Sequence, residues 1–384
     1  MNYKNVPGAK IRVASPVIGE REKGYVNDCL ESGWISSIGI YLARFEESFA
    51  RFCGVKHAIA TNNGTTALHL ALVALGVGPG DEVIVPTLSY IATANAVRYC
   101  GATPVLIDCD EETLNIDVLA IESKMTPRTR AIIPVHLYGQ PADMEAIIAI
   151  ARKHKLWVIE DCAQAHLARC NGQVVGTFGD IATFSFYPGK NLGAYGDAGC
   201  AVTNDDHLAD WMATFARHGG KGEHTMEGIN SRMDGLQATI LNVKLPYLLA
   251  WTGARRRVAA RYDELLNGVG GIVTPKVALD RDHVYHLYVI RTEKRDALRK
   301  DLTNAGIATV LNYPKALPFY PAYAYLSHAP QDFPVAYANQ SRILSLPIYP
   351  EMTEEMIAYI VDRIESFFQK SENIAVAQLA ERHG

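Results

Sequence analysis

The sequence has no motif of paired cysteines and no long apolar run. None of its 7 Cys residues stands in a C-x-x-C pair, and they are scattered through apolar segments. This distribution is typical of reduced, buried thiols and not of a disulfide framework or a zinc site. No stretch approaches the roughly 18 apolar residues of a membrane span, and the first residues contain no apolar core of a signal peptide. We therefore expect a cytoplasmic protein that is neither secreted nor embedded in a membrane.

An excess of basic residues is also missing. Lys and Arg total 37 against 41 Asp and Glu, which leaves a formal charge of −4. Nucleic-acid-binding proteins normally carry a basic excess, so nucleic acid is not expected as a partner. The 384 residues, of which 48% are hydrophobic, are enough for two or three folded domains with a sizeable core.

Familiar nucleotide-binding and metal-binding motifs are incomplete in this chain. The glycine-rich residues 76–80 follow a helical pattern and contain a proline where a helix should open, so they predict a turn. Gly189 and Lys190 are followed by Asn191 and not by Ser or Thr, which excludes a Walker motif. The histidines lack the spacing of metal ligands, and His136 is interpreted as a structural residue within a strand. No metal site is expected.

The chain contains an alternation of apolar runs and helical patterns. Apolar runs predict strands at residues 82–86, 104–108, 131–137, 156–161 and 181–187, and apolar spacing predicts helices at 65–75, 143–154 and 207–218. Apolar strands that alternate with helices favour an α/β fold whose mainly parallel mixed sheet is covered by helices. Ligands of such folds bind beyond the carboxyl ends of the strands, so we expect the site there.

The pattern changes near residue 250. Residues 233–249 predict a long helix with a kink at Pro246, and the basic stretch at 255–262 is interpreted as a solvated helix face. A strand at 286–291 and a helix at 294–305 follow. We therefore predict a large domain over residues 1–249 and a smaller α+β C-terminal domain over residues 250–384.

One helix start has the features of a phosphate site. Asn62, Asn63, Gly64, Thr65 and Thr66 open an apolar helix, so free backbone N–H groups, two hydroxyls and the positive end of the helix meet there. Taken alone, the same residues also describe an ordinary helix cap with a turn glycine.

Three further residues make the combination more specific. Asp161 ends an apolar strand, where an unpartnered carboxylate would be costly, so it needs a cationic partner. Ser185 lies near the end of another apolar strand, and Lys190 follows in a glycine-containing loop. A phosphate anchor, a partner for a pyridinium nitrogen and a lysine for a Schiff base are what pyridoxal phosphate requires. Together these residues favour a pyridoxal-phosphate enzyme.

The order of these residues resembles fold-type I pyridoxal-phosphate enzymes, and more narrowly the DegT/StrS-type sugar-nucleotide aminotransferases. The resemblance runs from Arg12 to Phe367, and its most specific segments are residues 64–68, 134–139, 160–166, 184–193 and 230–234. It implies an enzyme that moves an amino group from glutamate to a keto carbon of a nucleotide-linked deoxysugar. The cofactor would be pyridoxal 5'-phosphate, with pyridoxamine 5'-phosphate formed in the half-reaction.

The resemblance also implies a role for each candidate residue. Lys190 would bind the cofactor covalently and, once free, move a proton, while Asp161 would keep the pyridine nitrogen protonated. Tyr90 would stack on the ring and Gln164 would lie near its 3-hydroxyl. The phosphate would be held by Gly64, Thr65, Thr66 and Ser185, joined by Asn230 of the partner subunit. The resemblance therefore implies a homodimer with shared active sites.

Two departures from the family pattern are visible. Asn62 and Asn63 replace the Ser more often found before the glycine, and Asn312 stands where related sequences often have His before Tyr313. The first departure leaves phosphate binding intact, whereas the second affects the substrate contacts that the resemblance implies.

Several alternatives remain at this point. The lysine loop and residues 283–288 resemble the branch that aminates C3 of the sugar, whereas residues 34–37 and 99–105 resemble the perosamine-synthase branch, which aminates C4. We favour C3 because the lysine loop surrounds the carbon that is aminated. A sugar dehydratase of the same fold would carry His in place of Lys190, so the lysine argues against it. A non-catalytic sugar-sensing protein is the remaining alternative.

Overall fold

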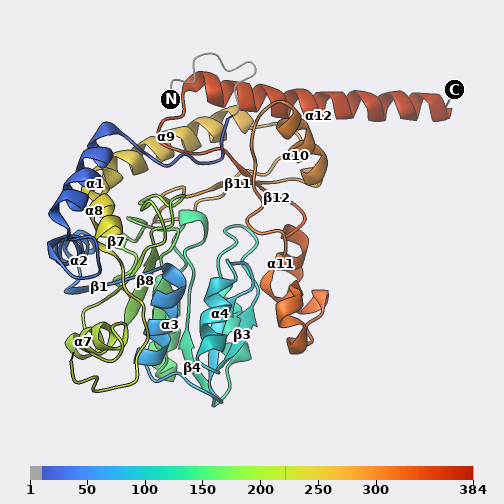
Figure 1. Ribbon diagram of the computed structural model, residues 1–384. Coiled ribbons are helices and arrows are strands. Elements are labelled where there is room, and N and C mark those ends of the chain that lie inside the picture. The colour runs from blue at the N-terminus through green and yellow to red at the C-terminus, as the bar shows by residue number, and fades with distance from the viewer. Residues whose placement is uncertain (1–10, 221, 384) are drawn as a thin grey trace.

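The computed structural model describes residues 11–220 and 222–383, with side chains as far as residue 370 (Figure 1). In the described part of the chain, seven strands form the central sheet. They lie side by side in the order β1 (His57–Thr61), β9 (Gly199–Thr203), β8 (Ile181–Ser185), β5 (Trp157–Asp161), β4 (Thr129–Ile132), β2 (Glu82–Pro86) and β3 (Thr103–Ile107). Strand β9 runs antiparallel to both neighbours, and the other adjacent pairs are parallel. The predicted mainly parallel mixed sheet is confirmed.

Helices cover both faces of this sheet. They are α2 (Ile40–Cys53), α3 (Gly64–Ala74), α4 (Ala92–Tyr99), α5 (Val118–Ile121), α6 (Met144–His154), α7 (Asp206–Phe215) and α8 (Gly235–Lys244), while α1 (Glu20–Ser32) packs on α8. Side chains of α3, α4 and α7 pack with Val83 and Val85 of β2 in one buried cluster. Ile84, between these two valines, belongs to the cluster that contains α6. Successive residues of a strand point to opposite faces, so these two clusters are the two sides of the sheet.

Most of the C-terminal part forms a smaller layer at one end of the molecule, whereas its short helix α11 (Pro334–Asn339) packs against the side of the large domain (Figure 1). Its antiparallel strands are β11 (Tyr288–Arg291) and β12 (Ile343–Leu346), and its other helices are α9 (Leu248–Leu266), α10 (Arg295–Asn304) and α12 (Glu354–His383). A third, short sheet contains β10 (Arg281–Asp282), β6 (Arg169–Cys170) and β7 (Gln173–Val174). A separate buried cluster joins α9, α10 and α12 and includes Ile11 from the start of the described chain. The predicted domain boundary falls in the first turn of α9 and stays a prediction.

The region around Pro246 differs in part from the sequence-based expectation. Helix α8 ends at Lys244, and a 3-10 turn that contains Pro246 connects it to α9, in agreement with the predicted kink. The solvated helix face predicted at residues 255–262 is wrong at Arg255. This guanidinium is buried and donates to the carbonyls of Tyr285 and Ile348, because those buried acceptors need a donor.

None of the helices in the described ranges is long and apolar enough to cross a membrane.

Candidate active site

The structure brings three of the predicted site residues to one edge of the sheet. Asp161 ends β5 and Ser185 ends β8, and these neighbouring parallel strands pair Asp161 with Thr183. Lys190 follows in the loop after β8, where its charge interacts with the carboxylate of Asp161. The site therefore lies at the carboxyl ends of the strands, where the topology predicts it.

Asp161 is buried but has only two hydrogen-bond donors among the described residues. Its Oδ2 accepts from Oγ1 of Thr93 at 2.9 Å, and its Oδ1 accepts from the backbone N–H of Ala163 at 3.1 Å. Thr93 is in turn hydrogen-bonded to the hydroxyl of Ser89 at 2.9 Å. Burial raises the pKa of Asp161, and the two donors and the charge of Lys190 oppose that rise. Each carboxylate oxygen can accept a further bond, so the side chain has room for a cationic donor.

Lys190 is the cationic group whose charge acts on Asp161. Burial lowers its pKa to about 8, and the carboxylate of Asp161 partly opposes that shift. A lysine with such a pKa loses its proton far more readily than an exposed one, which makes it a nucleophile and a base near neutral pH.

The start of α3 lies directly against the end of β8. A Cβ atom on Gly64 would come within 2.8 Å of Cβ of Ser185, so only glycine permits this approach. The backbone N–H groups of Gly64 and Thr65 lie in the first turn and have no partner within the helix. This places free donors at a positive helix end next to a serine hydroxyl, an arrangement that suits a phosphate.

The two threonines of this turn differ in availability. Within the described ranges, no hydrogen bond joins the hydroxyl of Thr65 to another residue. Thr66 donates its hydroxyl to Oδ1 of Asn62 at 2.5 Å and its backbone N–H to Oδ1 of Asn63 at 2.9 Å. Thr65 can therefore bind an anion directly, whereas Thr66 must first release Asn62.

Tyr90 and Gln164 lie near a tyrosine from the C-terminal part. The ring of Tyr90 is 59% exposed and its centroid lies 5.8 Å from that of Tyr313. Oε1 of Gln164 accepts from the backbone N–H of Tyr138 at 2.6 Å, and Nε2 donates to the hydroxyl of Tyr313 at 2.8 Å. The amide of Gln164 is therefore fixed in orientation, while the face of Tyr90 remains open to a ligand.

Asn230 lies apart from these residues. It is exposed, its backbone forms a bridge with Arg217, and its Oδ1 accepts from Nε of Arg232 at 2.9 Å. The hydroxyl of the next residue, Ser231, donates to Oδ1 of Asn62 at 3.1 Å.

His136 forms a buried pair that sequence reasoning did not identify. Its Nδ1 accepts from the backbone N–H of Ala142 at 3.1 Å, so the ring proton is assigned to Nε2, which donates to Glu160 at 3.1 Å. Cys162 lies close enough to complete a three-ligand metal group. However, Glu160 also accepts three backbone N–H groups at 2.7–2.8 Å. The carboxylate is saturated by these donors, which agrees with the structural interpretation of His136.

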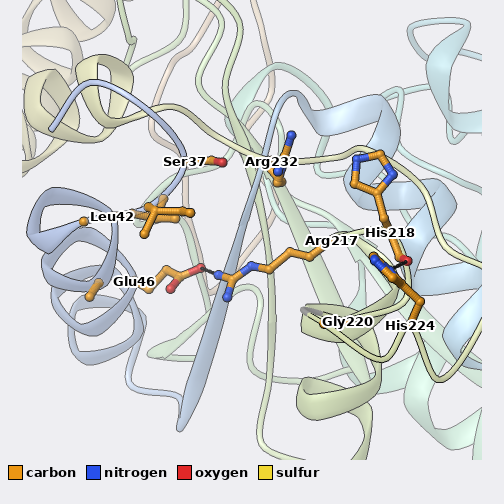
Figure 2. Close-up of a pocket in the computed structure, with 12 residues that line it drawn as sticks. Ser37, Leu42, Glu46, Arg217, His218, Gly220, His224 and Arg232 are labelled. Atoms are coloured by element: carbon orange, nitrogen blue, oxygen red, sulfur yellow. Dashed lines mark hydrogen bonds and ion pairs between the residues drawn. The ribbon is translucent and has the colours of Figure 1, made fainter.

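A cavity of about 480 Å³ contains none of the predicted site residues in its lining (Figure 2). Arg217 extends across it from the segment between α7 and α8 toward Glu46 of α2, with 3.8 Å between the charged atoms. Arg232 of the same segment also lines it. The cavity is therefore a feature of the segment that carries Asn230, and neither Lys190 nor Asp161 lines it.

The residues at the strand ends fit pyridoxal phosphate. The free donors at the start of α3 match its phosphate, and the Asp161 carboxylate has room for a protonated ring nitrogen. Lys190 provides an amine of lowered pKa. Sequence reasoning missed Thr93, whose contact with Asp161 spans 68 residues and leaves no local signal. It placed Asn62 at the start of the helix but did not predict its hydrogen bond with Ser231, 169 residues away.

Comparisons with known proteins agree with this fit. The model of the DegT/DnrJ/EryC1/StrS aminotransferase family matches residues 16–365. The chain is 44% identical to dTDP-3-amino-3,4,6-trideoxy-alpha-D-glucose transaminase of Streptomyces venezuelae, over 87% of this chain and 88% of that protein. It is 45% identical to GDP-perosamine synthase of Caulobacter vibrioides, over 93% of this chain and 98% of that protein.

A solved structure shows the same fold. The crystal structure of S. venezuelae DesV in complex with a ketimine intermediate superposes with a TM-score of 0.87 and 42% sequence identity, over 90% of this chain and 94% of that one. The fold-type I class expected from the sequence is confirmed. The chain belongs to the DegT/DnrJ/EryC1/StrS aminotransferase family, whose members use pyridoxal phosphate as their cofactor.

Proposed function

We propose that this aminotransferase transfers the amino group of glutamate to C3 of a nucleotide-linked keto-deoxysugar. The observation that carries the proposal is that Lys190 lies within electrostatic reach of the under-satisfied carboxylate of Asp161, beside the open donors of α3. When bound, pyridoxal phosphate would supply an electron-accepting ring and an attached carbon that can carry the amino group between the two substrates.

In this proposal the chain holds the cofactor through residues of several elements. Gly64 and Thr65 donate to the phosphate from the first turn of α3, together with Ser185 at the end of β8. Thr66 joins them when its hydroxyl turns away from Asn62. Tyr90 covers one face of the ring, and Gln164, fixed by Tyr138 and Tyr313, lies near its 3-hydroxyl.

Two residues control protons in this proposal. Asp161 holds a proton on the ring nitrogen, and its buried position strengthens that interaction because water does not compete. Lys190, with its pKa lowered to about 8, would accept at Nζ the proton that leaves the substrate carbon and would donate it again later in the same half-reaction. Thr93 keeps Asp161 ionised by donating to its Oδ2.

The proposed enzyme is a homodimer in which Asn230 completes the phosphate site of the partner subunit. Asn230 is exposed and lies in a segment whose neighbouring residue contacts the start of α3. The resemblance in the segment that contains Asn230, Ser231 and Arg232 supports this role.

The choice of C3 rests on the lysine loop. Residues 184–193 resemble the C3 branch, and this loop surrounds the carbon that receives the amino group. The two relatives bear names of both kinds, a 3-amino sugar transaminase and a perosamine synthase. Amination of C4 is therefore the second candidate, supported by residues 34–37 and 99–105.

The decisive experiment supplies 3-keto and 4-keto sugar nucleotides separately, each with glutamate, and identifies the products by mass spectrometry and NMR. An amine on C3 is expected, whereas exclusive amination of C4 would overturn the choice of carbon. Loss of a hydroxyl group without amination would indicate the dehydratase, which Lys190 argues against. Binding of the sugar nucleotide with no product from either substrate would favour the sugar-sensing alternative.

A further inference from the structure

One side chain joins the proposed phosphate site to the segment that carries Asn230. Oδ1 of Asn62 accepts from Oγ1 of Thr66 at 2.5 Å and from Oγ of Ser231 at 3.1 Å. Thr66 belongs to the first turn of α3, whereas Ser231 directly follows Asn230 in the chain. A single amide oxygen therefore connects two segments that the proposed function places in different active sites of the dimer.

The Ser231 end of this connection is held firmly. Ser231 is fully buried, and its backbone N–H donates to the carbonyl of Ala216 at 3.0 Å. The preceding residue, Asn230, pairs with Arg217 and accepts from Arg232. A shift of Ser231 therefore moves Asn230 with it, because both belong to one hydrogen-bonded stretch of backbone.

The Thr66 end responds to the phosphate. The hydroxyl of Thr66 has one hydrogen and two acceptors within reach, Oδ1 of Asn62 at 2.5 Å and the carbonyl oxygen of Asn63 at 3.0 Å, and the shorter distance favours Asn62. Phosphate oxygens are strong acceptors, so a phosphate at the start of α3 competes with Asn62 for that hydrogen. Filling the site changes the hydrogen bonding of Asn62, and Asn62 is bonded to Ser231.

Asn62 is not the residue that caps helix α3. The cap of α3 is the neighbouring residue, Asn63, whose Oδ1 accepts from the backbone N–H of Thr66 at 2.9 Å. The amide of Asn62 is therefore free to serve another role, and its two partners define that role.

We propose that Asn62 is a positioning residue that couples the phosphate site of its own subunit to the placement of Asn230 in the site of the partner subunit. The inference rests on the proposed function, because it requires the shared-site dimer. Its consequence is that a change at Asn62 in one subunit weakens cofactor binding in the other subunit.

Mixed dimers test this coupling. One subunit, the reporter, is unchanged, and the other carries Lys190→Ala together with one further substitution. Reporter and partner are tagged differently so that the mixed dimer can be purified. Pyridoxal phosphate is titrated in, borohydride fixes it on Lys190 of the reporter, and mass spectrometry measures the labelled fraction. The readout is the concentration that labels half of the reporter, and it does not depend on turnover.

The expected effect appears in the reporter although the substitution is in the other subunit. Asn62→Ala in the Lys190→Ala subunit should raise the half-labelling concentration about threefold to tenfold, as loss of a hydrogen bond of about 1 kcal/mol predicts. Ser231→Ala should act in the same way, because it breaks the same bond from the other end. Asn62→Asp, which retains an acceptor oxygen at this position, should restore the affinity.

Two controls separate the possible failures. Asn63→Ala removes the cap of α3 but not the hydrogen bond between Asn62 and Ser231. It should therefore change the half-labelling concentration of the reporter by no more than about twofold. Asn230→Ala tests the shared site itself. It should weaken cofactor binding by the reporter at least as much as Asn62→Ala does. If Asn230→Ala has no effect, the shared-site dimer is wrong and the coupling falls with it. If Asn230→Ala weakens the reporter while Asn62→Ala and Ser231→Ala do not, only the coupling is overturned.

Discussion

Glu160 and Asp161 are adjacent buried carboxylates at the end of β5, yet their surroundings differ. Glu160 accepts hydrogen bonds from His136 and from three backbone N–H groups. Among the described residues, Asp161 accepts only from Thr93 and Ala163, and it interacts with the charge of Lys190. Successive strand residues point to opposite faces, so each carboxylate meets a different side of the sheet.

The difference shows how a structural carboxylate can be told from a functional one. The four donors around Glu160 repay the cost of burying its charge, and no capacity is left for a ligand. Asp161 is buried without that compensation, so burial raises its pKa. A buried carboxylate with spare capacity beside a lysine is a group prepared to meet a further cation.

The largest effect is expected for substitution of Lys190, the residue whose charge interacts with Asp161. Lys190→Ala should still bind pyridoxal phosphate but lose at least about a thousandfold in kcat, since the covalent nucleophile is removed. Lys244 is a matched comparison, because burial also lowers its pKa to about 8 while it donates to the carbonyl of Gly193. Borohydride should fix the cofactor on the peptide that contains Lys190. Labelling of the Lys244 peptide would show that Lys190 is not the lysine that binds the cofactor.

Neutralising Asp161 should give the next largest effect. Asp161→Asn should retain the cofactor and lose at least about a hundredfold in kcat, because a preorganised charge partner is replaced by a neutral group. Steady-state kinetics run beside thermal melts measure both quantities. Near-normal turnover together with a lowered Tm would mean that Asp161 is a structural carboxylate like Glu160.

Neutralising Glu160 should have the opposite signature. Glu160→Gln replaces one acceptor oxygen by an NH2 group that faces N–H donors, and we expect it to lower the free energy of unfolding by about 2–3 kcal/mol. Turnover per folded molecule should change little. Denaturant unfolding and active-site titration provide the test, and a hundredfold fall in kcat with unchanged stability would remove the distinction between the two carboxylates.

The smallest effect is expected at Thr93, whose hydroxyl lies between Ser89 and Asp161 and donates to the carboxylate. Thr93→Val removes a donor to the carboxylate, so the pKa of Asp161 should rise further. Because the ionised form is the active one, the acid limb of the kcat profile should move to higher pH by about one unit. Thr93→Ser retains the hydroxyl and should leave the profile in place, and equal profiles for the valine and serine variants would contradict the role.

The sequence predicts those strands that lie within longer apolar runs. The predicted strand at 82–86 coincides with β2, and the other four overlap β3, β4, β5 and β8. Strands β1 and β9 were not predicted, because they consist mainly of small residues and exist through pairing with each other and with β8. Local propensity contains no information on such distant partners.

The candidate site divides in the same way. Asp161, Ser185 and Lys190 could be predicted because each follows an apolar strand, where a polar side chain requires a reason. Thr93 is an ordinary helical residue until the fold brings it to Asp161. The prediction that Arg255 lies on a solvated helix face was wrong for a related reason. The carbonyls that accept hydrogen bonds from Arg255 belong to residues 30 and 93 positions away in the chain.

The contact between Gly64 and Ser185 has a genetic consequence. A methyl group at position 64 would meet Cβ of Ser185 at 2.8 Å, whereas the next atoms, Cα of Ser185 and the carbonyl oxygen of Phe184, lie at 3.3 and 3.4 Å. Gly64→Ala should therefore be deleterious alone but recover folding when combined with Ser185→Gly, which removes the clashing atom. The two positions form an epistatic pair, so the residues tolerated at one depend on the residue already present at the other.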